Sequence, residues 1–247
     1  RIYGYKIDHI IQTEAEADAA LYDEQSNGYR VGDGRMVKGR KDAGDYEWRN
    51  RKGSARRDGE EIINDEDQFY LGNVMPHSTG GINNTFTYKN FTLSVFLQGT
   101  YGNDILAGGD FLYATVDPRF VNQYKRVKNF WSLDNPNGNY PKLYSNDEYQ
   151  PSTYMIHDGS HLKIKSISLY YNFPVKSWKK NKTIQELQCY VTGTNLFTFT
   201  SYKGYDPEVN TGTEGGYKVY SANVLRGMDF TAYPSARTYT FGFKITL

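Results

Sequence analysis

The chain has 247 residues, a formal net charge of +1, a mean hydropathy of −0.72 and a single cysteine, Cys189. A chain of this length can bury a sizeable core without disulfides or metals, and its near-neutral charge lacks the basic footprint of a nucleic-acid-binding protein. One cysteine excludes an intrachain disulfide framework and a cysteine-based zinc cluster, and no apolar run of about 18 residues predicts a transmembrane helix.

Period-two alternation of apolar and polar residues is the main pattern along the chain, and it predicts β-strands. In one segment Phe91, Leu93, Val95 and Leu97 share a face, and the Lys89-Asn90 pair before it predicts a tight hairpin. The last segment places Tyr239, Phe241, Phe243, Ile245 and Leu247 on one face. The six predicted strands cover residues 1–12, 79–88, 91–101, 160–173, 186–199 and 235–247.

The connections between these strands alternate in length. Residues 13–78, 102–159 and 200–234 form long connections, whereas 89–90 and 174–185 form short ones. Long loops at one end and short turns at the other are typical of an outer-membrane barrel, whose strands need only about 9–11 alternating residues to cross the bilayer. A polar lumen also accounts for the low hydropathy, because half of each strand does not face lipid.

A soluble β-sandwich is the main alternative, since its strands alternate in the same way. Aromatic residues near the strand ends favour the barrel, because membrane barrels carry aromatic girdles at both interfaces. These residues are Tyr88, Phe91, Tyr101, Tyr171, Phe173, Phe197 and Phe199. The pattern alone leaves both architectures open.

Four stretches resemble the C-terminal part of a SusC-like, TonB-dependent outer-membrane transporter of the Bacteroidetes type. They are Leu71–Pro76 with Asn83–Gly99, Asp158–Pro174, Gly193–Glu208 and Tyr233–Leu247, in the same order as in the family. Gly193–Glu208, which reads GTNLFTFTSYKGYDPE, is the most specific match. The fold class expected from this resemblance is all-β: an antiparallel transmembrane β-barrel segment of about six strands, with long extracellular loops.

The resemblance further implies a 22-stranded barrel with an N-terminal plug, so we expect residues 1–247 to be the C-terminal portion of the barrel, without the plug. Six strands cannot close a barrel, because about eight are needed. The remaining strands are therefore expected on another chain or segment, since strands left at the edges would be prone to aggregation. The expected location is the outer membrane, with the long loops extracellular and the C-terminus periplasmic.

The final strand resembles the signal that the barrel-assembly machinery reads. Polar Thr240 and Gly242 are followed by apolar Ile245 and Leu247, although Leu247 replaces the usual terminal aromatic residue. The alternative is that these residues only form a lipid-facing strand.

One loop departs from the family pattern. Members often carry an acidic Asp-x-Asn-x-Asp-Gly loop before the Leu-Gly-Asn stretch, which is a cage for a hard cation. Here five cationic residues, Arg49, Arg51, Lys52, Arg56 and Arg57, precede the acidic stretch 58–67 and would repel a divalent ion. We expect no metal site, and instead expect the two halves of the loop to pair with each other or with a partner; a cation on the acidic half is the alternative.

No motif points to catalysis. The four histidines, His9, His77, His157 and His161, lack metal-ligand spacing, and there is no nucleophile elbow, P-loop or dinucleotide fingerprint. Adjacent acidic pairs such as Glu60-Glu61 do not make two carboxylates that face one cleft. We therefore expect no enzyme activity, no catalytic residue and no cofactor.

With catalysis set aside, the remaining role is the binding of a ligand or partner. Aromatic side chains in the predicted loops can contact sugar rings and peptide backbones alike. The candidates for contact with substrate or partner are Trp48, Tyr113, Trp131, Tyr144, Tyr202 and Tyr205; alternatively they pack the loops together. The resemblance implies TonB-dependent import of an oligomeric nutrient; we favour an oligosaccharide as the substrate, with an oligopeptide as the alternative. The implied partners are a SusD-like surface lipoprotein, a TonB complex and outer-membrane lipid. We expect no nucleic-acid partner. A secreted or surface all-β carbohydrate-binding module or adhesin domain is the rival interpretation.

Overall fold

The computed structural model describes residues 1–23, 29–30, 36–37, 40–51, 61–114, 122–143, 145, 151–178, 183–209, 226–230 and 233–247. The chain divides into two compact units. A sheet unit comprises Met75–Asn103, Asp158–Glu208 and Ala232–Leu247, and a loop unit comprises Arg1–Val74, Asp104–His157 and Val209–Thr231. Across the described ranges, no helix has the length and apolar character needed to cross a membrane.

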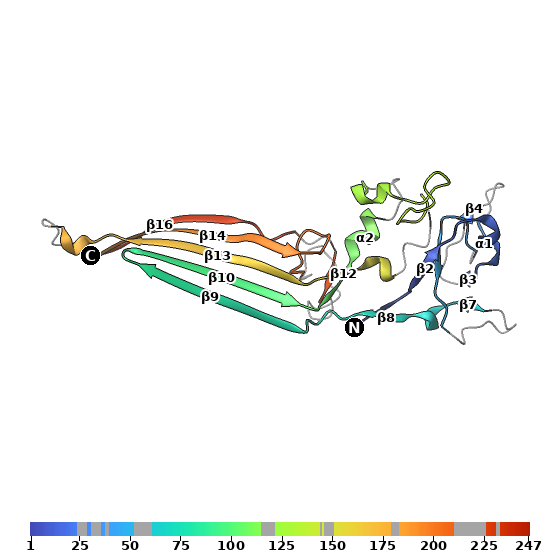
Figure 1. Cartoon of the computed structure of the whole chain (residues 1–247), viewed down its shortest axis with the longest axis horizontal. Coiled ribbons are helices and arrows are strands. Elements are labelled where there is room, and N and C mark those ends of the chain that lie inside the picture. Colours follow the sequence, from blue (N-terminus) through green and yellow to red (C-terminus); the bar gives the residue numbers. More distant parts are fainter. Residues whose placement is uncertain are drawn as a thin grey trace. The chain divides into compact units, whose positions relative to one another are not determined.

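Five long antiparallel strands form the sheet unit and lie side by side in Figure 1 in the order β16-β14-β13-β10-β9. Their bounds are Ser78–Tyr88 (β9), Phe91–Tyr101 (β10), His161–Asn172 (β13), Glu186–Thr200 (β14) and Thr238–Thr246 (β16). The predicted hairpin is confirmed, because Tyr88 pairs with Phe91 across a turn in which Lys89 adopts a left-handed φ of 51°. Five of the six predicted strands are thus present in one sheet.

The prediction that residues 1–12 form one strand of this sheet is wrong. Residues 1–12 contain two short strands, β1 (Ile2–Gly4) and β2 (Ile7–Ile10), which pair with β8 (Phe69–Gly72) and β6 (Tyr46–Trp48) in the loop unit. Between them Tyr5 is buried in the core of the loop unit. The sequence pattern in this segment therefore predicts extended structure, but neither the break between its two strands nor the strands with which they pair.

The register of β13 shifts at one residue. Phe96 of β10 pairs with Ser166, but the next residue, Leu97, pairs with Ile164, so that Lys165 is an extra residue in β13. Strict alternation from Ile167 would have placed Lys163 on the apolar face. The bulge reverses the phase and puts Lys163 in register with Gln98 on the polar face.

The loop unit is built from short elements. Its α-helices are α1 (Glu14–Ala19) and α2 (Gly108–Tyr113), and its 3₁₀ turns are Asp65–Asp67, Lys125–Lys128 and Thr153–Met155. A further 3₁₀ turn, Val175–Ser177, belongs to the sheet unit. The further strands of the loop unit are β3 (Tyr22–Asp23), β4 (Tyr29–Arg30), β5 (Met36–Val37), β7 (Ile62–Ile63), β11 (Asp104–Ala107) and β15 (Met228–Asp229), and β12 (Ile156–Asp158) pairs with β11. Thr13 caps α1, its hydroxyl accepting a hydrogen bond from the amide of Glu16 at 3.2 Å.

A buried ion pair lies beside the core of the loop unit. The core itself packs Tyr5, Tyr46, Trp48 and Ile63. The Asp23 and Lys41 side chains are almost fully enclosed, with Lys41 Nζ 3.0 Å from Asp23 Oδ2. The Trp48 indole donates to the same carboxylate oxygen at 2.9 Å, and Lys41 also donates to the Tyr46 carbonyl at 2.9 Å. This network satisfies the buried charges, as burial of an ion pair requires.

Candidate functional site at the loop end of the sheet

The sheet has one apolar and one polar face. Cross-strand pairing aligns apolar residues in rows, such as Phe86, Leu93, Leu169, Val191 and Phe241. The rows between them carry polar residues, such as Thr85, Ser94, Ser168, Thr192 and Thr240. The apolar side chains are not covered: Phe86, Phe241 and Phe243 are among the most exposed large hydrophobic residues of the described chain. An exposed apolar sheet face of this extent is typical of a surface that contacts lipid or a partner.

The two ends of the sheet differ in how they are connected. The turn 89–90 and the connection between β13 and β14 join strands at one end, where β16 also finishes. At the other end the chain enters β9, leaves β10 for β13, and leaves β14 for β16 through the long connections. We call this second end the loop end. The alternation of long and short connections is confirmed, although the first long segment begins before residue 13.

At the loop end, a buried lysine on the polar face holds the segment that follows β14. Lys163 Nζ is 2.5 Å from Asp206 Oδ1 and 2.8 Å from Glu208 Oε2, and its side chain is 2% exposed. Lys165, the extra residue of the bulge, reaches the same Glu208 oxygen at 2.6 Å. Asp206 also accepts hydrogen bonds from the amides of Glu208 and Ser235. We call Lys163, Lys165, Asp206 and Glu208 the ionic anchor.

The anchor was not among the sequence-predicted site residues. Its members come from two of the stretches that carry the family resemblance, Asp158–Pro174 and Gly193–Glu208. A signal was present, because the alternation changes phase between Ile164 and Ile167, and two lysines lie at this change. Such lysines need buried or luminal acidic partners.

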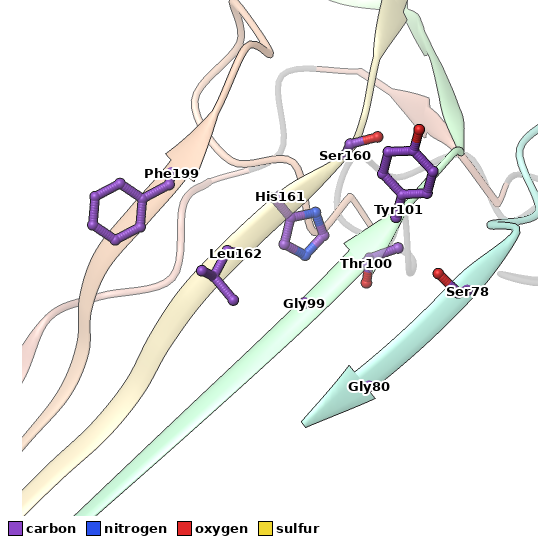
Figure 2. A pocket seen from close by; sticks show the side chains of 9 residues that line it. All are labelled: Ser78, Gly80, Gly99, Thr100, Tyr101, Ser160, His161, Leu162 and Phe199. Atoms are coloured by element: carbon purple, nitrogen blue, oxygen red, sulfur yellow. The ribbon is translucent and has the colours of Figure 1, made fainter. Parts of the chain in front are cut away.

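A hollow of about 380 Å³ lies at the loop end of β9, β10 and β13. Figure 2 shows Leu162 and Phe199 on one side of it and the hydroxyls of Ser78 and Thr100 on the other. Gly80 and Gly99 face each other across the two strands at this hollow. A Cβ at Gly80 would meet no atom within 4 Å, so close packing does not explain this glycine.

Comparison with known proteins gives relatives of one kind, although no protein-family profile matches the chain. TonB-dependent receptor P3 of Formosa agariphila is 32% identical over 188 residues, which are 76% of this chain and 18% of that protein. TonB-dependent receptor SusC of Bacteroides thetaiotaomicron is 26% identical over 191 residues, 76% of this chain and 17% of that protein. The chain belongs to the SusC-like TonB-dependent receptors. It spans about a fifth of the length of these relatives.

Solved structures agree on the fold. The RagAB peptide importer in its closed-closed state matches 99% of this chain and 22% of that chain, with a TM-score of 0.68 and 20% identity. A second RagAB transporter structure matches 82% of this chain and 21% of that chain, with a TM-score of 0.63 and 23% identity. The predicted fold class is confirmed as an antiparallel barrel segment, and its expected six strands are corrected to five.

In this SusC-like chain, most described aromatic candidates pack inward. Trp48 is 2% exposed within the loop-unit core, and Trp131 and Tyr202 are also buried. Trp131 donates its indole hydrogen to Gln12 Oε1 at 3.0 Å. Their burial favours the alternative over contact with a substrate: large rings remove much apolar area from water when buried, and the two indoles find acceptors inside. The alternative, that they pack the loops together, describes them.

Tyr205 is the exception among the described candidates, with 66% of its surface exposed. Its contact with a substrate or partner stays a prediction. Tyr144 and the Tyr113 side chain lie outside the described residues.

The acidic stretch 58–67 is described only from residue 61. Asp67 is fully buried, and its two carboxylate oxygens accept from the amides of Arg51 and Asn64. The Arg51 guanidinium donates to the Gln68 carbonyl at 3.1 Å. Within the described part of the loop, Arg51 thus contacts this stretch through its amide and its guanidinium, while pairing between the basic and acidic charges stays a prediction. Among the described residues, no group of three or more His, Cys, Asp or Glu side chains has metal-binding geometry.

The predicted assembly signal lies on β16. Thr240 pairs with Thr192 on the polar face, and Gly242 pairs with Tyr190. Ile245 and Leu247 are exposed on the apolar side. A Cβ on Gly242 would lie 2.4 Å from the Tyr190 ring, so cross-strand packing gives this glycine a structural role beside the predicted signal.

Substituting Gly242→Val separates these two roles. We expect the valine to displace Tyr190 at a cost of about 1–3 kcal/mol and to lower the amount of assembled barrel. The double variant Tyr190→Ala/Gly242→Val should restore assembly, measured by the heat-dependent shift on a detergent gel, and Thr240→Val serves as the control. If the double variant stays unassembled, Gly242 acts through the assembly signal and not through packing.

Acidification is expected to release the ionic anchor. Burial opposes ionisation of Asp206, but hydrogen bonds from Lys163 and two amides outweigh it and hold the pKa of Asp206 below its ordinary value. Burial likewise opposes ionisation of Glu208, whereas Lys163 and Lys165 lower the pKa of Glu208. The pKa values of Asp206 and Glu208 are lower in the folded protein than in the unfolded chain. The anchor therefore stabilises the protein at a pH above the ordinary carboxyl pKa, and this stabilisation is lost as the pH falls through the folded pKa values.

The measurement is hydrogen exchange of peptides that contain Glu208 and Ser235, corrected for the intrinsic pH dependence. Protection should fall below about pH 4 before the strands themselves lose protection. Protection that is independent of pH in this window would contradict the assignment.

Proposed function

We propose that this chain supplies neighbouring strands and extracellular connections of an outer-membrane barrel that imports an oligomeric nutrient with energy from a TonB complex. The observation that carries the proposal is the uncovered apolar face of the sheet, backed by a polar face, in a chain homologous to TonB-dependent receptors. The apolar face contacts lipid and the polar face lines the lumen. The loop end is extracellular, and Leu247 is periplasmic.

The dimensions of the apolar face suit a membrane. Phe91 and Tyr101 are exposed aromatic residues at opposite ends of β10. Ten residue steps span about 33 Å along the strand, which corresponds to about 25 Å of membrane thickness at a tilt of about 40°. The apolar band of outer-membrane barrels is about 25 Å tall, with aromatic girdles at its edges.

The proposed cargo is a glycan. Threonine and serine hydroxyls dominate the described polar face, and its two lysines at the loop end are already paired with Asp206 and Glu208. A neutral surface rich in hydroxyl groups suits hydrogen bonding to a polyhydroxylated ligand, and exposed aromatic rings such as Tyr205 suit sugar faces. A SusD-like surface lipoprotein is the proposed extracellular partner, and further strands pair with the free edges of β9 and β16.

The experiment that tests this function uses the full-length protein in its host. Membrane fractionation and a heat-dependent gel shift should place it in the outer membrane as a folded barrel, and deletion of its gene should abolish uptake of one class of labelled oligosaccharide. Loss of oligopeptide uptake alone would overturn the proposed cargo. Complete solubility without detergent and no heat-dependent shift would overturn the transporter and favour the secreted binding module.

A further inference from the structure

We infer that the ionic anchor fixes both stems of the connection between β14 and β16 to the polar face of the sheet, and that Lys163 is its positioning residue. The stems are residues 201–208 and 233–237. The inference rests on the proposed function, because it assigns these stems to the static wall of the import channel and not to a moving gate.

The first stem is held by charge, through a lysine that is itself enclosed and partners that are partly exposed. Three ion pairs of 2.8 Å or less join two lysines of β13 to Asp206 and Glu208, and the Lys163 side chain is 2% exposed. Two lysines and two carboxylates leave the cluster without net charge. A buried ammonium that loses its carboxylates is strongly unfavourable, so detachment of the stem is opposed as long as Lys163 is charged.

The second stem is bound to the same place by two further contacts. Asp206 Oδ2 accepts from the Ser235 amide at 3.2 Å, and Asn195 Nδ2 donates to the Ala236 carbonyl at 3.1 Å. Asn195 has a left-handed φ of 53° in β14, beside the Lys165 bulge of β13. The bulged residues of two neighbouring strands therefore each contribute a side chain that holds the connection.

The anchor also explains why the sequence interrupts the alternation of β13. Without the extra residue, Lys163 would point to the apolar face, where it could not reach the two carboxylates of the stem and where a charged side chain facing lipid is unfavourable. With it, Lys163 faces the polar side and meets both acidic residues of the stem. Bulges that re-aim a side chain in this way are characteristic of functional positions in sheets. Fixing the stems also fixes two exposed tyrosines, Tyr205 on the first and Tyr233 on the second.

The test removes the anchoring charge in the full-length protein on intact cells. Lys163→Met is expected to raise the rate of tryptic cleavage after Lys203 and Arg237 at least about tenfold, because cleavage follows the opened fraction. Lys163→Arg, which keeps the charge, should stay within about threefold of the wild type. The control is Lys244→Met, which breaks the exposed Lys244–Glu186 pair of the same sheet and should leave cleavage unchanged.

The heat-dependent gel shift and glycan uptake are recorded for every variant. If Lys163→Met fails to assemble, Glu208→Gln replaces it, since Glu208 lies outside the strands and its loss should still accelerate cleavage. An assembled Lys163→Met or Glu208→Gln barrel with wild-type cleavage would overturn the anchor. Accelerated cleavage with wild-type uptake would overturn the role of the fixed stems in import. If even the wild type imports no glycan while cleavage responds as expected, the proposed cargo fails and the anchor stands.

Discussion

Replacing Asp23 with Asn is expected to destabilise the loop unit by about 3–5 kcal/mol, the largest effect of any substitution considered for this chain. The substitution removes the carboxylate from Lys41, whose ammonium stays enclosed beside the Trp48 indole. Asn can still accept the hydrogen bond from the Trp48 indole, so the loss reflects the charge and not the packing. Hydrogen exchange of the β3 and β6 amides in the full-length protein measures the change in opening free energy.

The double variant Asp23→Asn/Lys41→Met is the matched control. Removing both charges leaves no uncompensated ion, so most of the lost stability should return. The heat-dependent gel shift should stay unchanged in both variants, because the network lies wholly in the loop unit. A single variant within about 0.5 kcal/mol of the wild type would contradict the structural role of the pair.

Replacing Val95 with Arg is expected to block barrel assembly at a cost of about 2–4 kcal/mol. Val95 lies midway along β10 on the apolar face, in a cross-strand row with Ile167 and Tyr239. An arginine there must enter the hydrocarbon region. Assembly is measured as the fraction of heat-modifiable protein in purified outer membranes.

The neighbouring substitution Ser94→Arg is the control for Val95→Arg. Ser94 pairs with Ser168 and Thr85 on the polar face, where an arginine stays in contact with water. We expect normal assembly and an altered rate of cargo uptake. Equal loss of assembly in both variants would mean that the two faces of β10 do not differ in their surroundings.

The sheet was largely predictable from sequence because alternation is a local property. The strand 91–101 was predicted with its observed bounds, and β9, β13 and β14 differ from their predictions by one residue at one or both ends. The strand 235–247 begins later, at Thr238, because residues 233–237 serve as a stem of the connection. Most of these strands have one largely apolar face, and that pattern fixes the register; β9 is the exception, since it places Asn84 opposite Val95.

Long-range contacts were not predictable. Residues 1–12 resemble the barrel strands in sequence, yet their partners β8 and β6 lie outside the sheet, and only the tertiary fold reveals this. Trp48 and Trp131 sit in polar sequence and looked exposed, but each indole meets an acceptor far away in sequence. Lys163 and Glu208 are 45 residues apart in the sequence. The sequence therefore shows only a break in the alternation of β13, and not the partners of its lysines.

The proposed function requires that the apolar face of this sheet contacts lipid and that its polar face contacts water. Its most direct test places a nitroxide spin label at position 94 or 95 of the full-length protein in lipid vesicles, after Cys189 and any cysteines outside these 247 residues have been replaced. We expect the label at Val95 to collide with dissolved oxygen and to be shielded from a water-soluble nickel chelate, whereas the chelate should reach the label at Ser94. Equal access of the chelate to both labels, or shielding of position 95 from both reagents as in a soluble core, would contradict it.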